Sequence, residues 1–293
     1  MRAAIVALIV AGGCTGTLDA FFAGDVVDTE RDVPYVAGSS NPRQMLDLYL
    51  PRGATGYPTV VFVHGGYWTA QDKDYYQPVV GLYGNVGRAL ARRGIGAAVI
   101  NYRLVPDVTF AEQFDDVAHA IAWVQANIDR RGGAPDRLVL AGHSAGGHIA
   151  ALAAFDDARL TAAGVDVTGI RGYAPLSPIF DLADMAAHPP PDRPHFNDEV
   201  TVPVFGTALA AHSPRTYFRA DVAPLLVVMG DHDEPYLVTQ IPAAVAEVTA
   251  LGAPVEFHTL ADHDHADVVL DFDTDHDAVT PLLAPFVVAV TAP

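Results

Sequence analysis

The feature that most constrains the fold is a regular alternation between short apolar runs and longer stretches with helical spacing. Residues 59–63, 96–100 and 138–141 are short apolar runs rich in small and β-branched side chains, a pattern typical of buried strands. Residues 81–93 and 110–130 instead place apolar side chains three and four positions apart, as on one face of a helix. Buried strands that alternate with such helices predict an α/β fold with a mostly parallel sheet covered on both faces.

The same alternation continues to the C-terminus and sets the expected domain organisation. Further strands are predicted at residues 47–50, 170–176, 224–229 and 255–260, and further helices at 145–155, 238–251 and 278–290. Residues 18–46 show no clear period and are predicted to be a lead-in segment to one domain over residues 47–293. Within it, about 177–220 hold seven prolines and little periodicity, which predicts a cap insertion beside a site.

Composition excludes several classes of protein. Hydrophobic residues make up 51% of the 293 residues, which is too apolar for a disordered chain. The formal net charge of −18 argues against a nucleic-acid partner, because the chain has too few cations to neutralise a run of phosphates. A single cysteine excludes an internal disulfide framework and any site with several cysteine ligands.

The first residues have the composition of an export signal. Met1 and Arg2 precede an apolar run, and small residues then lead to Cys14, the only cysteine. This pattern predicts a secretory signal over residues 1–17, and the run is too short to span a bilayer as a helix. The position of Cys14 also resembles a bacterial lipoprotein signal, in which case lipidation would be the one route to membrane attachment. Plain export, to the cell envelope or outside the cell, and an uncleaved apolar N-terminus are the alternatives.

One pentapeptide predicts a nucleophile. Gly142-His-Ser-Ala-Gly146 matches G-x-S-x-G, and it lies between the predicted strand that ends at Ala141 and the predicted helix that begins at Ala145. That setting is the one expected for a nucleophile elbow, in which a sharp turn lifts the Ser144 hydroxyl above the sheet. The alternative is a glycine-flanked serine that caps a helix.

A glycine pair after another strand predicts hydrogen-bond donors for an oxyanion. The run His64-Gly-Gly-Tyr-Trp68 follows residues 59–63. In a strand–loop arrangement of this kind, one donor comes from the loop and another from the residue after the serine. The predicted oxyanion hole is therefore the N–H groups of Gly66, Tyr67 and Ala145. His64 is predicted to pack and shape the loop, while Tyr67 and Trp68 either bind substrate or pack.

Acidic and histidine residues that follow the last two strands compete for the roles of acid and base. Asp233 is preferred as the acid because it lies third after a glycine, with Asp231 and then Glu234 as alternatives. His265 is preferred as the base because it directly precedes an apolar stretch, with His263 as the alternative. The segment from His263 to Asp267 resembles a metal-binding pattern but lacks its final histidine, so no metal is predicted.

Together these motifs resemble the α/β-hydrolase superfamily. The order of His64-Gly-Gly-Tyr-Trp68, Asn101-Tyr-Arg-Leu104, Gly142-His-Ser-Ala-Gly-Gly147 and Asp264-His265 is similar to HGG-type carboxylesterases, close to the bacterial esterase and kynurenine formamidase-like (arylformamidase) group. The chain departs from that pattern at Ala266, where a phenylalanine often follows the histidine.

The resemblance implies an α/β-hydrolase fold and a serine esterase without a cofactor. Its Ser-His-Asp triad would cleave a small-molecule ester through an acyl-enzyme. An arylformamidase acting on a formamide is the nearest alternative, and a non-catalytic binding protein with the same fold is a more distant one.

Overall fold

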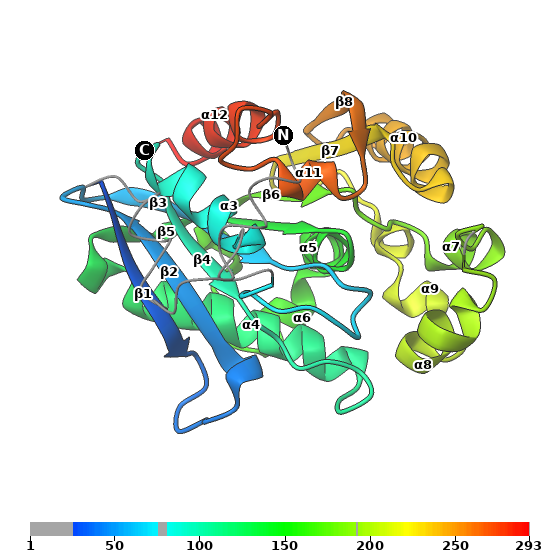
Figure 1. Ribbon diagram of the computed structural model, residues 1–293, viewed down its shortest axis with the longest axis horizontal. Coiled ribbons are helices and arrows are strands. Elements are labelled where there is room, and N and C mark those ends of the chain that lie inside the picture. Colours follow the sequence, from blue (N-terminus) through cyan, green and yellow to red (C-terminus); the bar gives the residue numbers. More distant parts are fainter. Residues whose placement is uncertain (1–25, 76–80, 192, 293) are drawn as a thin grey trace, which may run out of the picture.

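The computed structural model describes residues 26–75, 81–191 and 193–292, which fold around one eight-stranded sheet (Figure 1). The strand order is β1-β2-β4-β3-β5-β6-β7-β8. β2 pairs antiparallel with both β1 and β4, and all the other neighbouring strands are parallel. The strands are β1 (Val27–Pro34), β2 (Met45–Pro51), β3 (Tyr57–Val63), β4 (Gly96–Ile100), β5 (Gly133–His143), β6 (Ile170–Leu176), β7 (Leu225–His232) and β8 (Val255–Asp264). The predicted mostly parallel α/β fold is confirmed.

Helices cover both faces of this sheet, as the mostly apolar strands require. The α-helices are α3 (Leu82–Ala91), α4 (Phe110–Asn127), α5 (Ala145–Phe155), α6 (Asp157–Ala162), α7 (Leu182–Ala187), α8 (Val202–Phe205), α9 (Leu209–His212), α10 (Pro235–Ala250), α11 (Asp267–Leu270) and α12 (Thr280–Val290). The short helical turns are η2 (Pro42–Gln44), η3 (Asp129–Arg131), η4 (Val167–Gly169), η5 (Asn197–Thr201) and η6 (Pro214–Tyr217).

Two hydrophobic clusters mark the two faces. In β3, Val61 and Val63 belong to the cluster that contains α4, α5 and α10, while Val60 and Phe62 belong to the one that contains α3, α11 and α12. Successive side chains of a strand point to opposite faces, so a run that is apolar throughout fits a strand buried on both sides. The carboxyl ends of the parallel strands are therefore left as the edge where polar residues meet.

The predicted lead-in segment contains an edge strand that the sequence analysis did not identify. β1 pairs antiparallel with β2, from Val27 opposite Pro51 to Pro34 opposite Met45. Only Val27 of its eight residues is buried, so the strand lacks the apolar alternation that would reveal it.

The proline-rich segment forms short helices rather than an extended loop. It contains α7, η5, α8, α9 and η6, all on the same side of the molecule (Figure 1). Its Phe196 ring packs edge-on against Tyr67, with the centroids 5.5 Å apart, and its Phe205 ring packs against Trp68 at 4.8 Å. The segment thus contacts the loop that follows β3, and its action as a cap stays a prediction.

The one lysine of the chain is buried in a cluster of carboxylates. Lys73 Nζ lies 2.9 Å from Asp47 of β2 and 2.7 Å from both Asp32 and Asp74. Burial alone would lower the pKa of this amine, but the surrounding carboxylates raise the pKa above its ordinary value. Lys73 is therefore an ammonium ion that ties the loop before α3 to the sheet.

The predicted signal, with Cys14, falls within residues 1–25 and so lies outside the described residues. Among the helices that the structure does describe, none combines the length and hydropathy needed to cross a bilayer.

Candidate active site

Ser144 lies at the sharp turn between β5 and α5. Its backbone has φ 56° and ψ −118°, a conformation that non-glycine residues rarely adopt, and its N–H donates to the Leu176 carbonyl at 2.9 Å. The turn is possible because strand and helix approach very closely: a Cβ on Gly146 would lie 2.1 Å from the Val63 carbonyl oxygen. Ser144 therefore occupies the strained strand-to-helix turn that G-x-S-x-G predicts.

The structure brings His265 to Ser144. His265 follows β8, and its Nε2 lies 2.9 Å from Ser144 Oγ. Its Nδ1 lies 2.7 Å from Asp233 Oδ1. With the imidazole proton on Nδ1, His265 donates to the carboxylate and accepts from the serine hydroxyl, which is the arrangement of a general base.

Asp233 is buried and accepts from three donors. Oδ1 accepts from His265 Nδ1 and, also at 2.7 Å, from the Glu234 N–H, while Oδ2 accepts from the Ser177 hydroxyl at 2.5 Å. Burial raises the pKa of this carboxyl, but the hydrogen bonds from His265, Ser177 and Glu234 outweigh it, so the net pKa is below the usual value. Asp233 is thus a carboxylate fixed in orientation at the side of His265.

The alternative acid and base lie elsewhere. Asp231 is exposed, and its Oδ1 accepts from the His263 N–H at 3.3 Å. His263 Nδ1 donates in turn to the Ala261 carbonyl at 2.7 Å. Glu234 directly precedes α10 and donates its N–H to Asp233. These residues support the loops around the site, while Asp233 and His265 form the hydrogen-bond chain to Ser144.

Of the predicted oxyanion donors, Gly66 and Tyr67 line the same cavity as Ser144, and Ala145 follows Ser144 directly. Gly66 has φ +108°, and a Cβ there would lie 2.2 Å from the Ala70 carbonyl oxygen, so only glycine fits. The Gly65 N–H donates to the Tyr83 hydroxyl at 3.0 Å and is already used. Within the described residues, the N–H groups of Gly66 and Ala145 donate to no backbone or side-chain acceptor, as groups reserved for a ligand would.

A chain of hydrogen bonds holds the loop that carries Gly66. The Tyr83 hydroxyl donates to Gln71 Oε1 at 2.6 Å, and the Arg43 guanidinium donates to the Gln71 carbonyl. Farther along, the Lys73 N–H donates to Asn101 Oδ1 at 2.6 Å. The loop is therefore fixed at several points, as a preorganised group of N–H donors must be.

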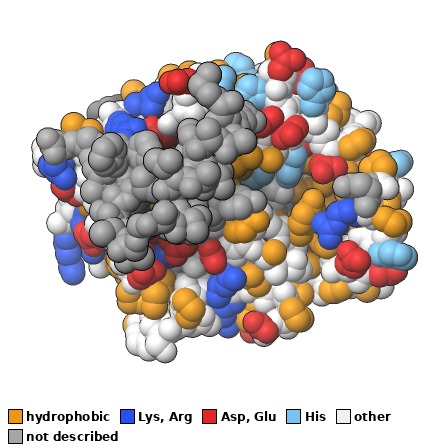
Figure 2. Space-filling view, viewed as in Figure 1, with side chains coloured by type: hydrophobic (Ala, Val, Ile, Leu, Met, Phe, Trp, Pro, Cys, Tyr) orange, Lys and Arg blue, Asp and Glu red, His pale blue; other side chains and the backbone are white. Residues whose placement is uncertain are grey.

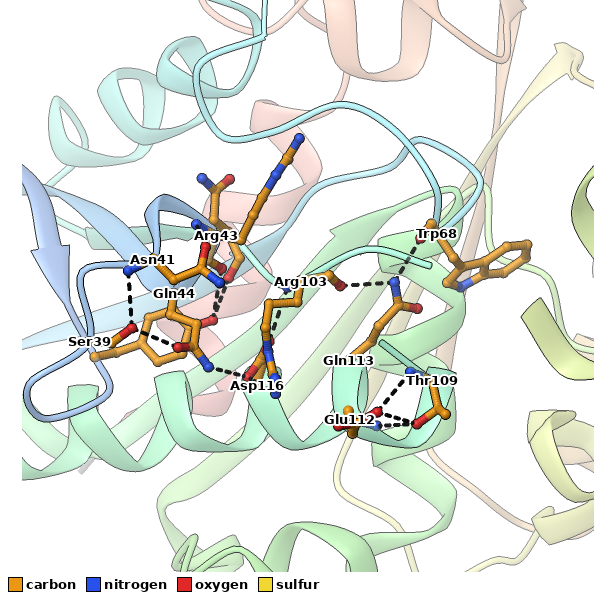
Figure 3. A network of polar contacts seen from close by, with 12 residues as sticks. Ser39, Asn41, Arg43, Gln44, Trp68, Arg103, Thr109, Glu112, Gln113 and Asp116 are labelled. Carbon is orange, nitrogen blue, oxygen red and sulfur yellow. Dashed lines mark hydrogen bonds and ion pairs between the residues drawn. The ribbon is translucent and has the colours of Figure 1, made fainter. Parts of the chain in front are cut away.

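His64 and Trp68 pack into the core. The His64 ring stacks on Tyr102 with the centroids 4.3 Å apart, and burial lowers the pKa of this imidazole to about 3. Trp68 is only 1% exposed, lies edge-on to the His148 ring, and its carbonyl accepts from Gln113 Nε2, which also donates to the Arg103 carbonyl (Figure 3). Of the two predicted substrate-binding aromatics, Trp68 is thus a packing residue, because α4 and the proline-rich segment cover it.

A cavity of about 180 Å³ opens beside Ser144 and His265. Tyr67 is in its lining, together with apolar side chains of α3 and α11, among them Leu82, Val269 and Leu270. Aliphatic and aromatic walls of this kind favour an uncharged group of a ligand. A larger groove of about 520 Å³ lies between β7, β8 and α12, but none of the predicted site residues line it.

The surface around the site is acidic. Figure 2 shows acidic and histidine side chains next to one another over β8, and the exposed residues of this region include Asp231, His232, Asp262 and Asp264. No group of three histidine, cysteine or carboxylate residues suited to a metal occurs in the described part of the chain. The negative potential of this acidic surface disfavours anionic ligands.

Three residues near the site escaped the sequence analysis: Ser177, Tyr83 and His143. Ser177 opens the proline-rich segment and has φ +45°, and its hydroxyl contacts Asp233 fifty-six positions away. Tyr83 lies on an expected helix with no motif around it. Of the three, only His143 could have been singled out from the sequence, because it lies inside the pentapeptide itself.

Comparison with known proteins gives a consistent picture. The family model described as BD-FAE matches residues 46–243. A probable isoprenylcysteine alpha-carbonyl methylesterase, ICMEL1 of Oryza sativa subsp. japonica, is 36% identical over 174 residues, which are 57% of this chain and 38% of the relative. The chain thus spans about two fifths of that protein.

Other relatives align over more of the chain. Esterase LipQ of Mycobacterium tuberculosis is 31% identical over 80% of this chain and 56% of the relative. Kynurenine formamidase of Drosophila melanogaster is 25% identical over 82% and 77%, respectively. The crystal structure of esterase B from Lactobacillus rhamnosis superposes with a TM-score of 0.78 at 22% identity, covering 91% of this chain and 87% of the other. The chain belongs to the BD-FAE family of α/β-hydrolases.

Proposed function

We propose that the chain is a serine esterase that hydrolyses carboxylic esters, with Ser144 as nucleophile, His265 as general base and Asp233 as the acid. The observation that carries the proposal is the continuous hydrogen-bond chain from Ser144 Oγ to His265 Nε2 at 2.9 Å and from His265 Nδ1 to Asp233 Oδ1 at 2.7 Å. Relatives named as esterases support the choice of an ester as substrate.

The proposed reaction has two halves. Ser144 Oγ attacks the ester carbonyl as His265 Nε2 takes its proton, and the tetrahedral intermediate expels the alcohol, to which His265 returns the proton. Water then attacks the acyl-enzyme while His265 takes a proton from it, and the acid leaves as Ser144 regains its hydrogen. Asp233 stabilises the imidazolium in both halves. The chemistry requires no cofactor.

The proposed oxyanion donors are the N–H groups of Gly66, Tyr67 and Ala145. Gly66 and Tyr67 line the cavity beside Ser144, and Ala145 begins α5, whose N-terminus favours negative charge. Because the Gly65 N–H already donates to Tyr83, the loop would supply its donors from the next two residues.

A formamide is the second candidate substrate. The specific observation in its favour is the alignment with Drosophila kynurenine formamidase, which covers 77% of that protein. The same residues would cleave a formamide, with His265 protonating an aromatic amine instead of an alcohol. An ester is preferred because the relatives named as esterases align at higher identity, 36% and 31%, than the formamidase does at 25%.

The test is a side-by-side assay of the full chain with a short-chain aryl ester and an N-formyl aromatic amine. We expect ester turnover that is lost in Ser144→Ala and retained in Ser40→Ala, which removes an exposed hydroxyl instead. A rate ratio that strongly favours the formamide would replace the ester by the second candidate. Full activity of Ser144→Ala would refute the mechanism, and a lack of both activities would leave a binding protein unless an organophosphate still labels Ser144.

A further inference from the structure

His143 lies in the centre of the site, but the proposed mechanism does not use it. It is the last residue of β5, directly before Ser144, and its side chain is in the lining of the cavity. The residue is only 5% exposed. A buried imidazole beside two reacting groups needs a partner for its polar atoms, because an unpaired buried donor or acceptor is costly.

The partner of His143 is the main chain of the base. His143 Nε2 lies 2.9 Å from the His265 carbonyl oxygen, which can only accept, so His143 is the donor and carries its proton on Nε2. The two imidazole rings also contact each other, with centroids 4.7 Å apart and planes inclined by 41°. One side chain thus holds both the backbone and the ring of His265.

The other side of His143 faces the glycine loop. A Cβ on Gly65 would lie 3.4 Å from His143 Nδ1 and 3.2 Å from the His143 carbonyl oxygen. The absence of a side chain at Gly65 therefore lets the loop after β3 close over His143. The imidazole is enclosed between the segment that carries the base and the segment that carries the proposed oxyanion donors.

His143 does this as a neutral ring near neutral pH. Burial, and then the neighbouring His265, lower the pKa of His143 to about 3. A second positive charge 4.7 Å from His265 would oppose formation of the His265 imidazolium. A neutral donor holds the base in place without that cost.

We propose that His143 is a positioning residue that holds the His265 main chain so that Nε2 stays within hydrogen-bond reach of Ser144. This inference rests on the proposed function, since His143 acts through His265. It gives the second position of the pentapeptide a role of its own, separate from that of the serine beside it. His143 itself exchanges no proton with the substrate.

The experiment compares a donor-free variant with one that keeps an N–H. His143→Leu removes the donor, while His143→Gln retains an amide N–H on a side chain of similar reach. We expect kcat of His143→Leu to fall about 10- to 100-fold, as for loss of a hydrogen bond to a buried acceptor, and His143→Gln to recover most of it. KM should change by less than about twofold, because the missing interaction is not with substrate. His258→Leu, which alters a histidine of β8 outside the site, is the matched control.

Two acyl lengths separate positioning from substrate contact. An aryl acetate and an aryl butyrate should lose the same factor in His143→Leu. A loss that grows with acyl length, or appears mainly in KM, would make His143 a wall of the cavity and overturn the proposal. Wild-type kcat in His143→Leu would overturn it as well.

Two further measurements keep the test decisive. If His143→Leu does not fold, His143→Phe provides a second donor-free side chain that keeps an aromatic ring against His265. If the wild type hydrolyses neither ester, the proposed function fails, and the rate at which a small organophosphate labels Ser144 replaces kcat. The labelling rates should then still rank wild type and His143→Gln above the donor-free variants, and equal rates would refute the role of His143.

Discussion

Replacing Asp233 by asparagine should remove the negative charge of the proposed acid while keeping its hydrogen bond to His265. Asp233 Oδ1 accepts from both His265 Nδ1 and the Glu234 N–H at 2.7 Å. An asparagine must place its carbonyl oxygen there, because an NH₂ group would meet the Glu234 N–H head-on. Its NH₂ group then faces the Ser177 hydroxyl, which can rotate from donor to acceptor. The His265 tautomer is therefore retained in Asp233→Asn, and only the negative charge is lost.

The magnitude follows from that single loss. Two charges about 4 Å apart attract by about 4 kcal/mol at an effective dielectric constant near 20. Because the His265 side chain is 21% exposed, we take about 2–4 kcal/mol of imidazolium stabilisation as lost, which is roughly 30- to 10³-fold in kcat. Asp233→Ala also loses control of the tautomer and should cost about 10⁴-fold. Asp231→Asn, at the exposed alternative acid, should leave kcat unchanged.

The assay is kcat for an aryl butyrate, corrected for active sites by titration with an organophosphate. Equal losses in Asp233→Asn and Asp233→Ala would show that asparagine does not take the orientation set by Glu234. A near wild-type kcat in Asp233→Asn, or a larger loss in Asp231→Asn, would refute Asp233 as the acid.

Three further outcomes are expected. Gly146→Ala should lower the free energy of unfolding, measured with urea, by about 3 kcal/mol or more, because its Cβ would lie 2.1 Å from the Val63 carbonyl oxygen. The control Gly172→Ala, whose Cβ meets movable side chains at 3.1 Å, should lower it by about 1 kcal/mol. The free energy of unfolding, measured with urea, should fall from pH 6 to pH 4 with a slope of up to about 4 kcal/mol per pH unit, because unfolding lets three buried neutral histidines take up protons. A free energy that does not change with pH would contradict the lowered pKa values, each about 3, of His64, His143 and His148. Expressed in a bacterium, the chain should fractionate with membranes if Cys14 is lipidated, and Cys14→Ser should release it; equal fractionation of both would leave plain export or an uncleaved N-terminus.

Local patterns predicted the central part of this molecule because each depends on neighbours in sequence. The pentapeptide around Ser144 fixed the expected position of the elbow, since its glycines are required by the close approach of β5, α5 and β3. The expected strand 96–100 and helix 145–155 match β4 and α5 at both ends. The preference for His265 over His263 agrees with the hydrogen-bond chain, and its role awaits the experiments above.

The parts that sequence could not provide depend on contacts between distant residues. Nothing near Ser177 indicates that its hydroxyl lies 2.5 Å from Asp233, and Trp68 could not be assigned to packing before the segment that covers it was seen. β1 was missed because a one-sided edge strand buries little. These are properties of the assembled sheet edge, where the segments after β3, β5, β6, β7 and β8 meet, and no local period encodes them.

The buried ammonium of Lys73 has a practical consequence for anyone who handles this protein. A lysine-specific protease has one peptide bond to cut in all 293 residues, and the side chain it must grip is 1% exposed in the folded state. The rate of digestion into two fragments would therefore report how often the region around Lys73 unfolds locally. For the same reason, amine-directed crosslinkers and dyes would find no accessible lysine on the folded chain.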